Sequence, residues 1–325
     1  MQRVQVLLVA KPWRGGLARY VFQALQDLLP GDVAWIPTYP VGAADRLAYV
    51  RDRARWRRAL VARIGAVQYR AALFINHFPE LDGLPPDDRH VLWLTDGPEP
   101  DAGGFMPYHR VFVSDPGYGE AIRGAVGTRR YAGELAFAFH PDIHRPQADR
   151  GRPEGFCMIA NRDVKRDFHL GMLLAVGLRP RVYGNYFLRH PLALRHPGCF
   201  RPRVSNDAMG RVYARHALSL NVHARVLREG TNMRSFECAG YGVPQLIEYR
   251  PGLERHFEPD AEVAVYREPG QAVDAVRGLL ADPRRARELA ARAARRALAE
   301  HTYHHRLARA LDGLISAARL RRPGH

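Results

Sequence analysis

The sequence contains few cysteines, almost no lysine and no long apolar run, and each shortage excludes a class of protein. Its three cysteines, Cys157, Cys199 and Cys238, show no C-x-x-C spacing, which argues against a disulfide framework or a zinc site. The apolar run before Lys11 is too short for a signal peptide or a transmembrane helix, and no later segment could span a bilayer. We therefore expect a cytoplasmic protein that begins with a buried strand.

Acidic residues are also scarce relative to basic ones. The 325 residues include 49 Lys and Arg against 33 Asp and Glu, a net charge of +16, and only Lys11 and Lys165 are lysine. This excess favours polyanionic or phosphorylated partners, or an anionic membrane surface. A solvated arginine-rich surface explains it equally well. Helix-turn-helix, zinc-finger and RNA-recognition signatures are absent from the sequence, so no stable nucleic-acid complex is expected.

What is present is an alternation of apolar runs and amphipathic stretches, which is typical of parallel α/β sheets. Expected strands cover 3–10, 33–37, 71–76, 90–95, 110–114, 134–139, 156–160, 181–185, 217–223, 244–249 and 262–266. Expected helices cover 17–29, 45–66, 116–126, 167–177, 206–215, 232–240, 271–281, 284–300 and 303–320.

The polar stretch 144–155 is rich in Pro, Gly and Arg and reads as a linker. It predicts two Rossmann-like, doubly wound domains, 1–148 and 149–325, facing each other across a cleft. Ligands of such sheets bind at the carboxyl ends of the strands, so the strand-to-helix loops are the candidate sites.

Two of these loops carry features suited to phosphate. Gly15 and Gly16 separate the first strand from the first helix, and adjacent glycines let a ligand approach the backbone and the helix N-terminus. A tight turn without a ligand is the simpler alternative. Arg162, Lys165 and Arg166 cluster where the first strand of the second half gives way to a helix, and they suit a diphosphate. An exposed basic helix start remains the alternative there.

A third loop lies in "VLREGTNMRSFECAGYGVPQLI" (226–247). Glu229 is expected in the loop after a strand, Thr231 or Asn232 can cap the following helix, and Glu237 lies within that helix. The two carboxylates could bracket a ligand, with phosphates on the helix N-terminal amides and sugar hydroxyls on the acids. Alternatively, Glu237 pairs with an arginine and Glu229 is an ordinary loop residue.

Together, these loops resemble the GT-B glycosyltransferases, specifically the family 4-like group (glycosyl transferases group 1) that includes CgeB-like proteins. The resemblance is strongest over 219–283 and "AEHTYHHRLARAL" (299–311), where the Glu-x7-Glu pattern falls on Glu229 and Glu237. It implies that Glu229 contacts the donor sugar, Glu237 the ribose, and Arg162 and Lys165 the diphosphate. The other donor-binding residues expected from it are Gly15, Gly16, Asn161, Tyr183, His223, Arg228, Gly230, Thr231, Asn232 and Met233.

The N-terminal domain matches this group only loosely, although it would bind the acceptor. His77 and Asp96 follow strands there and are the remaining catalytic candidates, with a loop cap as the alternative for each. The last helix is expected to cross back to this domain.

The resemblance implies transfer of a sugar, a hexosyl group in particular, from a nucleotide-diphosphate sugar, with retention of configuration and without a metal or another cofactor. The acceptor stays open among an anionic polymer, a lipid-linked sugar, a protein and a small molecule. Docking on an anionic membrane would reach a lipid-linked acceptor. The alternatives are a nucleotide-sugar epimerase of the same architecture and a basic nucleic-acid-binding protein.

Overall fold

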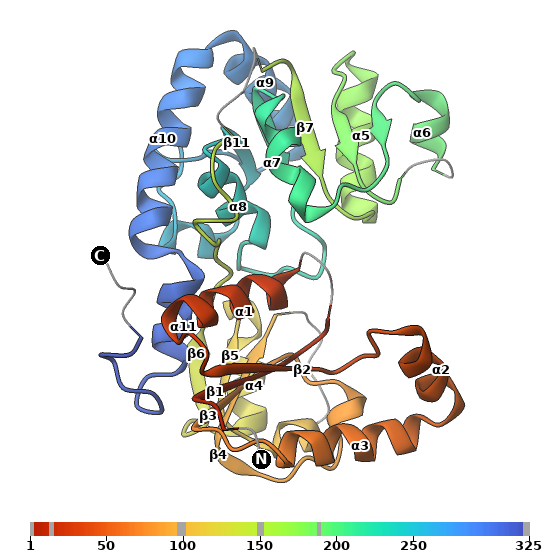
Figure 1. Cartoon of the computed structure of the whole chain (residues 1–325). Coiled ribbons are helices and arrows are strands. Elements are labelled where there is room, and N and C mark those ends of the chain that lie inside the picture. The colour runs from red at the N-terminus through yellow and green to blue at the C-terminus, as the bar shows by residue number, and fades with distance from the viewer. Residues whose placement is uncertain (1–2, 13–15, 96–101, 148–152, 187–189, 321–325) are drawn as a thin grey trace. The chain divides into compact units, whose positions relative to one another are not determined.

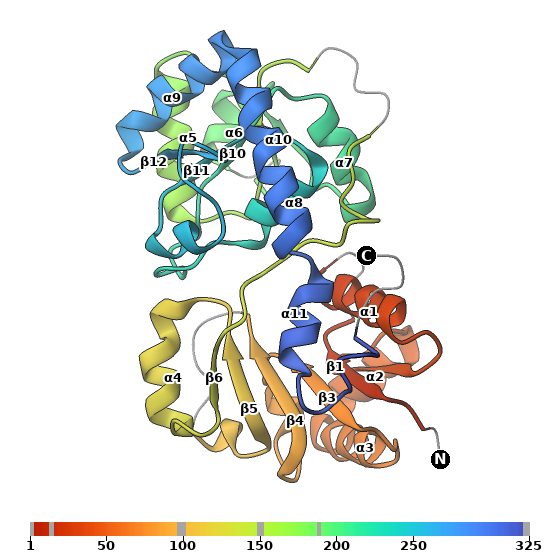
Figure 2. The ribbon, with the colours of Figure 1, turned by 90° about the vertical axis from the view of Figure 1, so that its left-hand side faces the viewer.

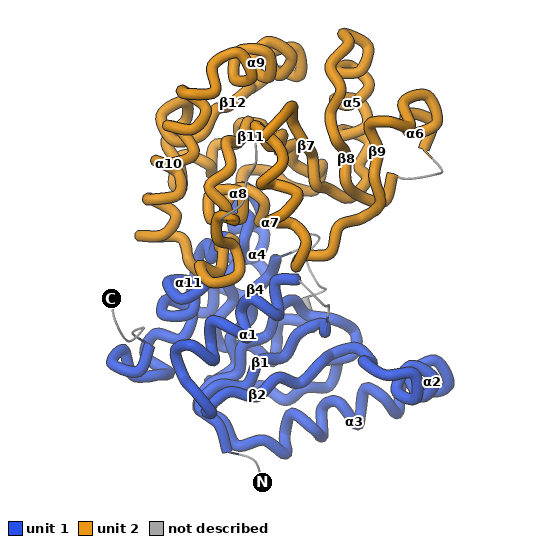
Figure 3. Tube along the Cα trace, turned by 45° about the horizontal axis from the view of Figure 1, so that its top comes forward, with its two compact units in different colours: residues 1–136, 303–325 blue, residues 137–302 orange. Residues whose placement is uncertain are grey.

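The computed structural model describes residues 3–12, 16–95, 102–147, 153–186 and 190–320 (Figure 1). The chain divides into two compact units, which Figure 3 colours separately: unit 1 holds residues 1–136 and 303–325, and unit 2 holds residues 137–302. The expected boundary at residue 148 therefore lies within unit 2, and the last helix belongs to unit 1.

Unit 1 is built on a six-stranded parallel sheet with the order β2-β1-β3-β4-β5-β6. Its central strands are continuous apolar runs, as expected where helices cover both faces. The strands are β1 (Val6–Ala10), β2 (Val33–Pro37), β3 (Ala71–Ile75), β4 (Asp87–Leu94), β5 (Tyr108–Val113) and β6 (Tyr131–Glu134). The α-helices are α1 (Leu17–Leu28), α2 (Ala43–Arg51), α3 (Arg53–Gly65), α4 (Gly119–Val126) and α11 (Tyr303–Ala310).

Helix α11 completes unit 1 although it comes from the far end of the chain. It lies beside α1 (Figure 2). The ring of Tyr303 stacks on that of Tyr20 with centroids 6.1 Å apart, and His304 Nε2 lies 2.9 Å from Asp27 Oδ2. Arg306 Nε donates a hydrogen bond to the carbonyl of Ala136 at 2.9 Å. The first two contacts fix the last helix to the first one, and the third fixes it to the segment after β6.

Unit 2 repeats the parallel arrangement with the strand order β12-β11-β10-β7-β8-β9. The strands are β7 (Phe156–Ile159), β8 (Arg181–Tyr183), β9 (Phe200–Arg201), β10 (Leu218–Asn221), β11 (Gln245–Glu248) and β12 (Ala264–Tyr266). The α-helices are α5 (Val164–Ala175), α6 (Pro191–Arg195), α7 (Asn206–Ala214), α8 (Met233–Tyr241), α9 (Pro269–Ala281) and α10 (Pro283–Glu300). Two six-stranded parallel sheets with helices confirm the expected doubly wound α/β class.

Several expected elements are wrong in detail. The single helix 45–66 is two helices, because the Asp52 carboxylate accepts the backbone N–H of Arg55 at 2.8 Å and starts a new helix there. The strand expected at 134–139 lies earlier, at Tyr131–Glu134. The helix expected over 303–320 is shorter and ends at Ala310. The short elements α6 and β9 were not expected at all, since neither is long enough to show a period.

All three cysteines are buried and none forms a disulfide. Among the described residues, no helix combines the length and the apolar character needed to cross a membrane.

The segment that opens unit 2 passes close to α8. The Phe139 N–H donates to the carbonyl of His301 at 3.2 Å, which ties this segment to the end of α10. On the side of α8, Gly240 faces the ring of Phe139 and the backbone of His144, and a Cβ built on Gly240 would lie 2.8 Å from the His144 oxygen. That distance is too short for any other residue without movement of the backbone.

We predict that Gly240→Ala lowers the thermal unfolding midpoint, although alanine is the better helix former by about 1 kcal/mol. The new methyl group overpacks the contact, which typically costs about 1–3 kcal/mol. Gly278→Ala in α9 is the matched control, because a Cβ there meets no atom within 4 Å. Calorimetry of both variants checks this, and equal midpoints for the two would contradict it.

Candidate active site

The candidate site of unit 2 lies at the carboxyl edge of its sheet, where three parallel strands end. Strand β7 leads through residues 160–163 into α5, β10 leads through residues 222–232 into α8, and β11 is followed by Tyr249 and Arg250. Side chains from all three connections meet at this edge, which is where ligands of such sheets bind.

The carboxylate of Glu248, at the end of β11, collects donors from the other two connections. Lys165 Nζ lies 2.8 Å from it and Arg250 Nη2 3.0 Å from it, and the backbone N–H of His223 donates to it at 3.0 Å. Burial lowers the pKa of the Lys165 ammonium, and the charge of Glu248 partly offsets this effect. Lys165 is thus a half-buried cation already held by an acid.

Of the two arginines expected beside Lys165, Arg166 is buried and Arg162 is exposed. The buried Arg166 donates to the carbonyl of Val222 from Nε and to the carbonyl of Asn161 from Nη1, both at 2.9 Å, and so ties the loops after β7 and β10 together. The side chain of Arg162 is exposed, with its Nε 3.2 Å from Asp167 Oδ2, and its backbone N–H donates to Asn185 Oδ1 at 2.6 Å. Arg162 is therefore the accessible guanidinium of this pair.

Glu237 is completely buried. Its Oε2 forms an ion pair with Nη1 of Arg234, one turn earlier on α8, and its Oε1 lies 3.4 Å from Nε2 of His144. Burial alone would raise the pKa of the Glu237 carboxyl, but Arg234 and His144 outweigh it and lower the pKa. The sequence-based alternative, in which Glu237 pairs with an arginine, thus describes the contact that the structure contains.

The loop between β10 and α8 places the other predicted residues. Glu229 and Arg228 are exposed, Gly230 and Thr231 are buried, and Met233 is half-buried. Asn232 caps α8, as expected, by accepting the N–H of Ser235 at 3.3 Å.

This loop is braced against the turn after β11. The carbonyl of Glu229 accepts the N–H of Gly252 at 2.8 Å, and a Cβ on Gly252 would lie 2.6 Å from that oxygen. The loop backbone is therefore fixed while the Glu229 side chain stays accessible.

His223 follows β10 and is fully buried. Neither of its ring nitrogens has a hydrogen-bond partner among the described residues. Burial first, and then the positive charges of Lys165, Arg250 and Arg166, lower the pKa of His223 to about 3. The imidazole is therefore neutral at physiological pH, and it does not lie on the surface that a ligand would meet.

Two further predicted donor residues lie after the neighbouring strands. Asn161 is exposed and contributes its carbonyl to Arg166. Tyr183 is half-buried, its ring meets that of His216 edge-on at 5.9 Å, and burial raises its pKa.

His77 is occupied within unit 1, with Nδ1 2.8 Å from the Tyr108 hydroxyl and Nε2 3.3 Å from Asp82 Oδ1, and burial lowers its pKa. Gly16 caps α1 in an extended conformation, as a glycine turn before a helix does. Gly15 and Asp96 lie outside the described residues.

Four residues at this edge were not predicted from the sequence: Glu248, Arg250, Arg234 and His144. Glu248 had a usable signal, because an acid closing an apolar strand must find partners at the sheet edge. Arg234 had one too, since a cation in the first turn of a helix is unfavourable without an anion nearby. Arg250 had one as well, since it follows Glu248 by only two residues. His144 had none, because only the fold brings it to Glu237.

Comparison of the sequence with known proteins indicates the family that the second half of the chain resembles. Residues 166–312, somewhat less than half of the chain, match the model of a family described as glycosyl transferase-like. None of the curated proteins matches the sequence.

Solved structures resemble the chain over nearly its whole length. Sucrose-phosphate synthase from Thermosynechococcus elongatus is 13% identical, with a TM-score of 0.67 over 96% of this chain and 97% of that one. HepE from Anabaena, in complex with UDP and glucose, is 13% identical, with a TM-score of 0.66 over 92% and 96%. WaaG, a glycosyltransferase involved in lipopolysaccharide biosynthesis, is 13% identical, with a TM-score of 0.62 over 94% and 98%.

At this identity the likeness establishes the fold, which is that of the GT-B glycosyltransferases. The family match adds that residues 166–312 resemble glycosyl transferases in sequence. The narrower CgeB-like assignment stays a prediction.

We predict that Glu237→Gln destabilises the protein at pH 7 by about 2–3 kcal/mol, because it leaves a buried site facing Arg234 and His144 without its charge. Since the pKa of Glu237 is lowered in the folded state, its stabilisation is present above the ordinary carboxyl pKa and is lost as pH falls through the folded value. Thermal unfolding midpoints should therefore differ most at neutral pH and converge in acid.

The exposed Glu229→Gln variant is the control and should change the midpoint much less at every pH. A Glu237→Gln midpoint equal to that of Glu229→Gln at pH 7 would contradict the buried role.

Proposed function

We propose that the chain transfers a glycosyl group, specifically a hexosyl group, from a nucleotide-diphosphate sugar to an acceptor. The observation that carries the proposal is the placement of Arg162, Lys165, Arg234 and Arg250 at the carboxyl ends of β7, β10 and β11, beside the N-terminus of α8. A departing diphosphate develops negative charge, which basic side chains and helix N-terminal amides stabilise. The binding of UDP by the structurally similar HepE supports a nucleoside diphosphate as the leaving group.

Arg234 is, in this proposal, the basic group that α8 itself contributes. It lies in the first turn of the helix, its side chain is about one quarter exposed, and its Nε lies 3.4 Å from the carbonyl of Ile159 at the end of β7. A guanidinium carries five N–H donors in a fixed plane, so it can hold a carboxylate on one edge and a phosphate on another. The contact with Glu237 orients that plane.

Glu237 accordingly acts as a positioning residue for Arg234 rather than as a ligand of the ribose. Its complete burial and its two protein partners favour this role. Glu229, exposed in the loop before α8, keeps the role of contacting the donor sugar.

Lys165 and Arg250 form a second group of cations, held by Glu248. An ammonium has three donors, so Lys165 can keep Glu248 and still reach a phosphate oxygen. With these cations stabilising the leaving group, the reaction needs no metal ion for that purpose. We propose a metal-independent reaction that retains the anomeric configuration.

We predict that one of UDP, GDP, dTDP and CDP raises the thermal unfolding midpoint more than the others. Arg234→Met should weaken binding of that nucleotide at least tenfold, because a charge-assisted hydrogen bond contributes about 1.5–3 kcal/mol. Glu237→Gln should weaken it in the same direction by releasing the guanidinium. Titration calorimetry at a temperature where every variant is folded gives these affinities.

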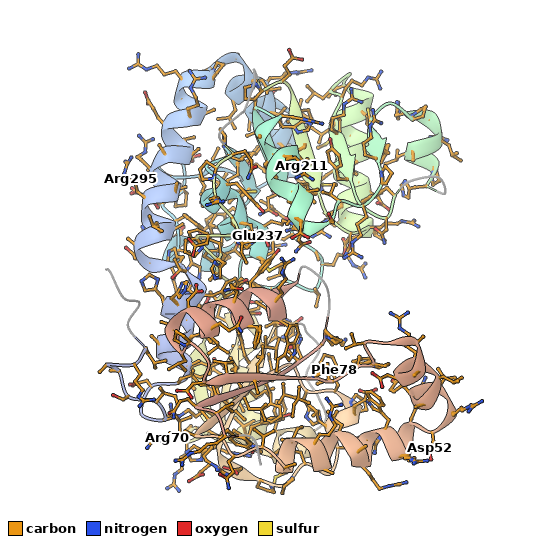
Figure 4. All side chains as sticks on the ribbon, in the orientation of Figure 1. Asp52, Arg70, Phe78, Arg211, Glu237 and Arg295 are labelled. Carbon is orange, nitrogen blue, oxygen red and sulfur yellow. The ribbon has the colours of Figure 1, made fainter. Side chains whose placement is uncertain are left out.

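Arg295→Met is the matched control, since Arg295 is an exposed arginine on α10 (Figure 4) and the variant removes the same charge. Equal weakening by Arg234→Met and Arg295→Met would reduce the effect to net charge and reject the site. Wild-type affinity in a folded Glu237→Gln protein would reject the positioning role alone.

Metal independence and retention of the anomeric configuration are tested by two separate measurements. We predict that transfer from the matched nucleotide sugar is unchanged by EDTA and that the product anomer, read by NMR at early times, has the configuration of the donor. Loss of activity in EDTA with recovery on adding Mg²⁺ or Mn²⁺ would contradict the first expectation, and an inverted anomer the second.

A further inference from the structure

Helix α2 of unit 1 exposes aliphatic side chains that a helix on a sheet would normally bury. None of its residues is buried, and the side chains of Leu47 and Val50 are 53% and 75% exposed. Val41, just before the helix, is 60% exposed. Leu47 and Val50 are three residues apart and therefore lie on the same side of the helix.

The opposite side of α2 explains why this orientation is fixed. Tyr49 is half-buried, its hydroxyl donates to Glu80 Oε1 at 2.6 Å, and its ring packs edge-on against Trp56 of α3 with centroids 6.0 Å apart. Because Tyr49 faces the rest of unit 1, Leu47 on the opposite side of the helix points away from the unit. The helix follows the edge strand β2 and reaches out past it, with Asp52 at the corner between α2 and α3 (Figures 1 and 4).

Helices α2 and α3 are rich in arginine. Between residues 43 and 65 the chain carries seven arginines and only two acids, Asp45 and Asp52. Of the arginines only Arg57 is not exposed, and it lies 3.6 Å from Asp82. The exposed arginines are Arg46, Arg51, Arg53, Arg55, Arg58 and Arg63.

We propose that this α2 face, consisting of Val41, Leu47 and Val50 with Arg46 and Arg51, docks on an anionic lipid bilayer. Aliphatic side chains on an amphipathic helix enter the boundary between headgroups and acyl chains, while arginines pair with headgroup phosphates and anionic lipids. A bilayer fits this face better than a nucleic acid does, because exposed leucine and valine have no partner on a nucleic-acid backbone. The inference concerns unit 1 alone and does not depend on the identity of the donor.

Vesicle co-sedimentation with the full chain tests the proposal. We expect binding to vesicles of phosphatidylglycerol and phosphatidylcholine to be at least tenfold tighter than to pure phosphatidylcholine, and to weaken as salt screens the arginines. Leu47→Ser combined with Val50→Ser should weaken binding to the anionic vesicles about tenfold. Arg46→Gln combined with Arg51→Gln should weaken it and also reduce its salt dependence.

Leu298→Ser on α10 is the matched control, because Leu298 is also 53% exposed on an arginine-rich helix, and it should leave binding unchanged. Circular dichroism and the unfolding midpoint establish that each variant is folded.

Three results would overturn the proposal: equal binding to neutral and anionic vesicles, unchanged binding in the Leu47/Val50 variant, or equal weakening by Leu298→Ser. Binding of a DNA or RNA duplex that is lost in the arginine variant but kept in the Leu47/Val50 variant, with no vesicle binding, would make nucleic acid the partner.

Discussion

Two of the cations at the edge of unit 2, Lys165 and Arg250, depend on one buried carboxylate, that of Glu248. It joins three segments that are distant in the chain: Lys165 on α5, the backbone of His223 after β10, and Arg250 after its own strand. Removing a carboxylate from water costs several kcal/mol unless donors surround it. The donors that satisfy Glu248 therefore include two cations whose positions are fixed in the absence of a ligand. If a diphosphate binds there as proposed, less ordering of side chains is needed.

A second buried carboxylate acts in the same way one helix further on. Glu237 sits between His144, from the segment that opens unit 2, and Arg234, in the first turn of α8. An arginine at the positive end of a helix is unfavourable by itself. Glu237 compensates for it and directs the guanidinium toward the end of β7. Both acids thus orient cations, and the neutral His223, whose backbone N–H donates to Glu248, adds no further positive charge.

The sequence predicted the parallel α/β class and the loops that reach the edge, because buried parallel strands are continuous apolar runs and glycine or asparagine marks the helix starts. It predicted the Asn232 cap for the same local reason. It could not predict that Glu237 is enclosed, since His144 is far away in the chain and carries no local signal. The single helix 45–66 is wrong because no proline or glycine interrupts the sequence near Asp52, and only the capping hydrogen bond of Asp52 marks the break. Gly15 and Asp96 fall outside the described residues, so their predicted roles stay predictions.

The two lysines of this arginine-rich chain each follow the first strand of a unit. Lys11 comes directly after β1, with Nζ 3.9 Å from the centroid of the Phe78 ring, and Lys165 lies in the first turn of the helix after β7. A guanidinium stays charged in almost any surrounding, whereas an ammonium loses pKa when it is buried. At Lys165 burial already lowers the pKa. A diphosphate bound as proposed would add negative charge beside Lys165 and would oppose this lowering of its pKa.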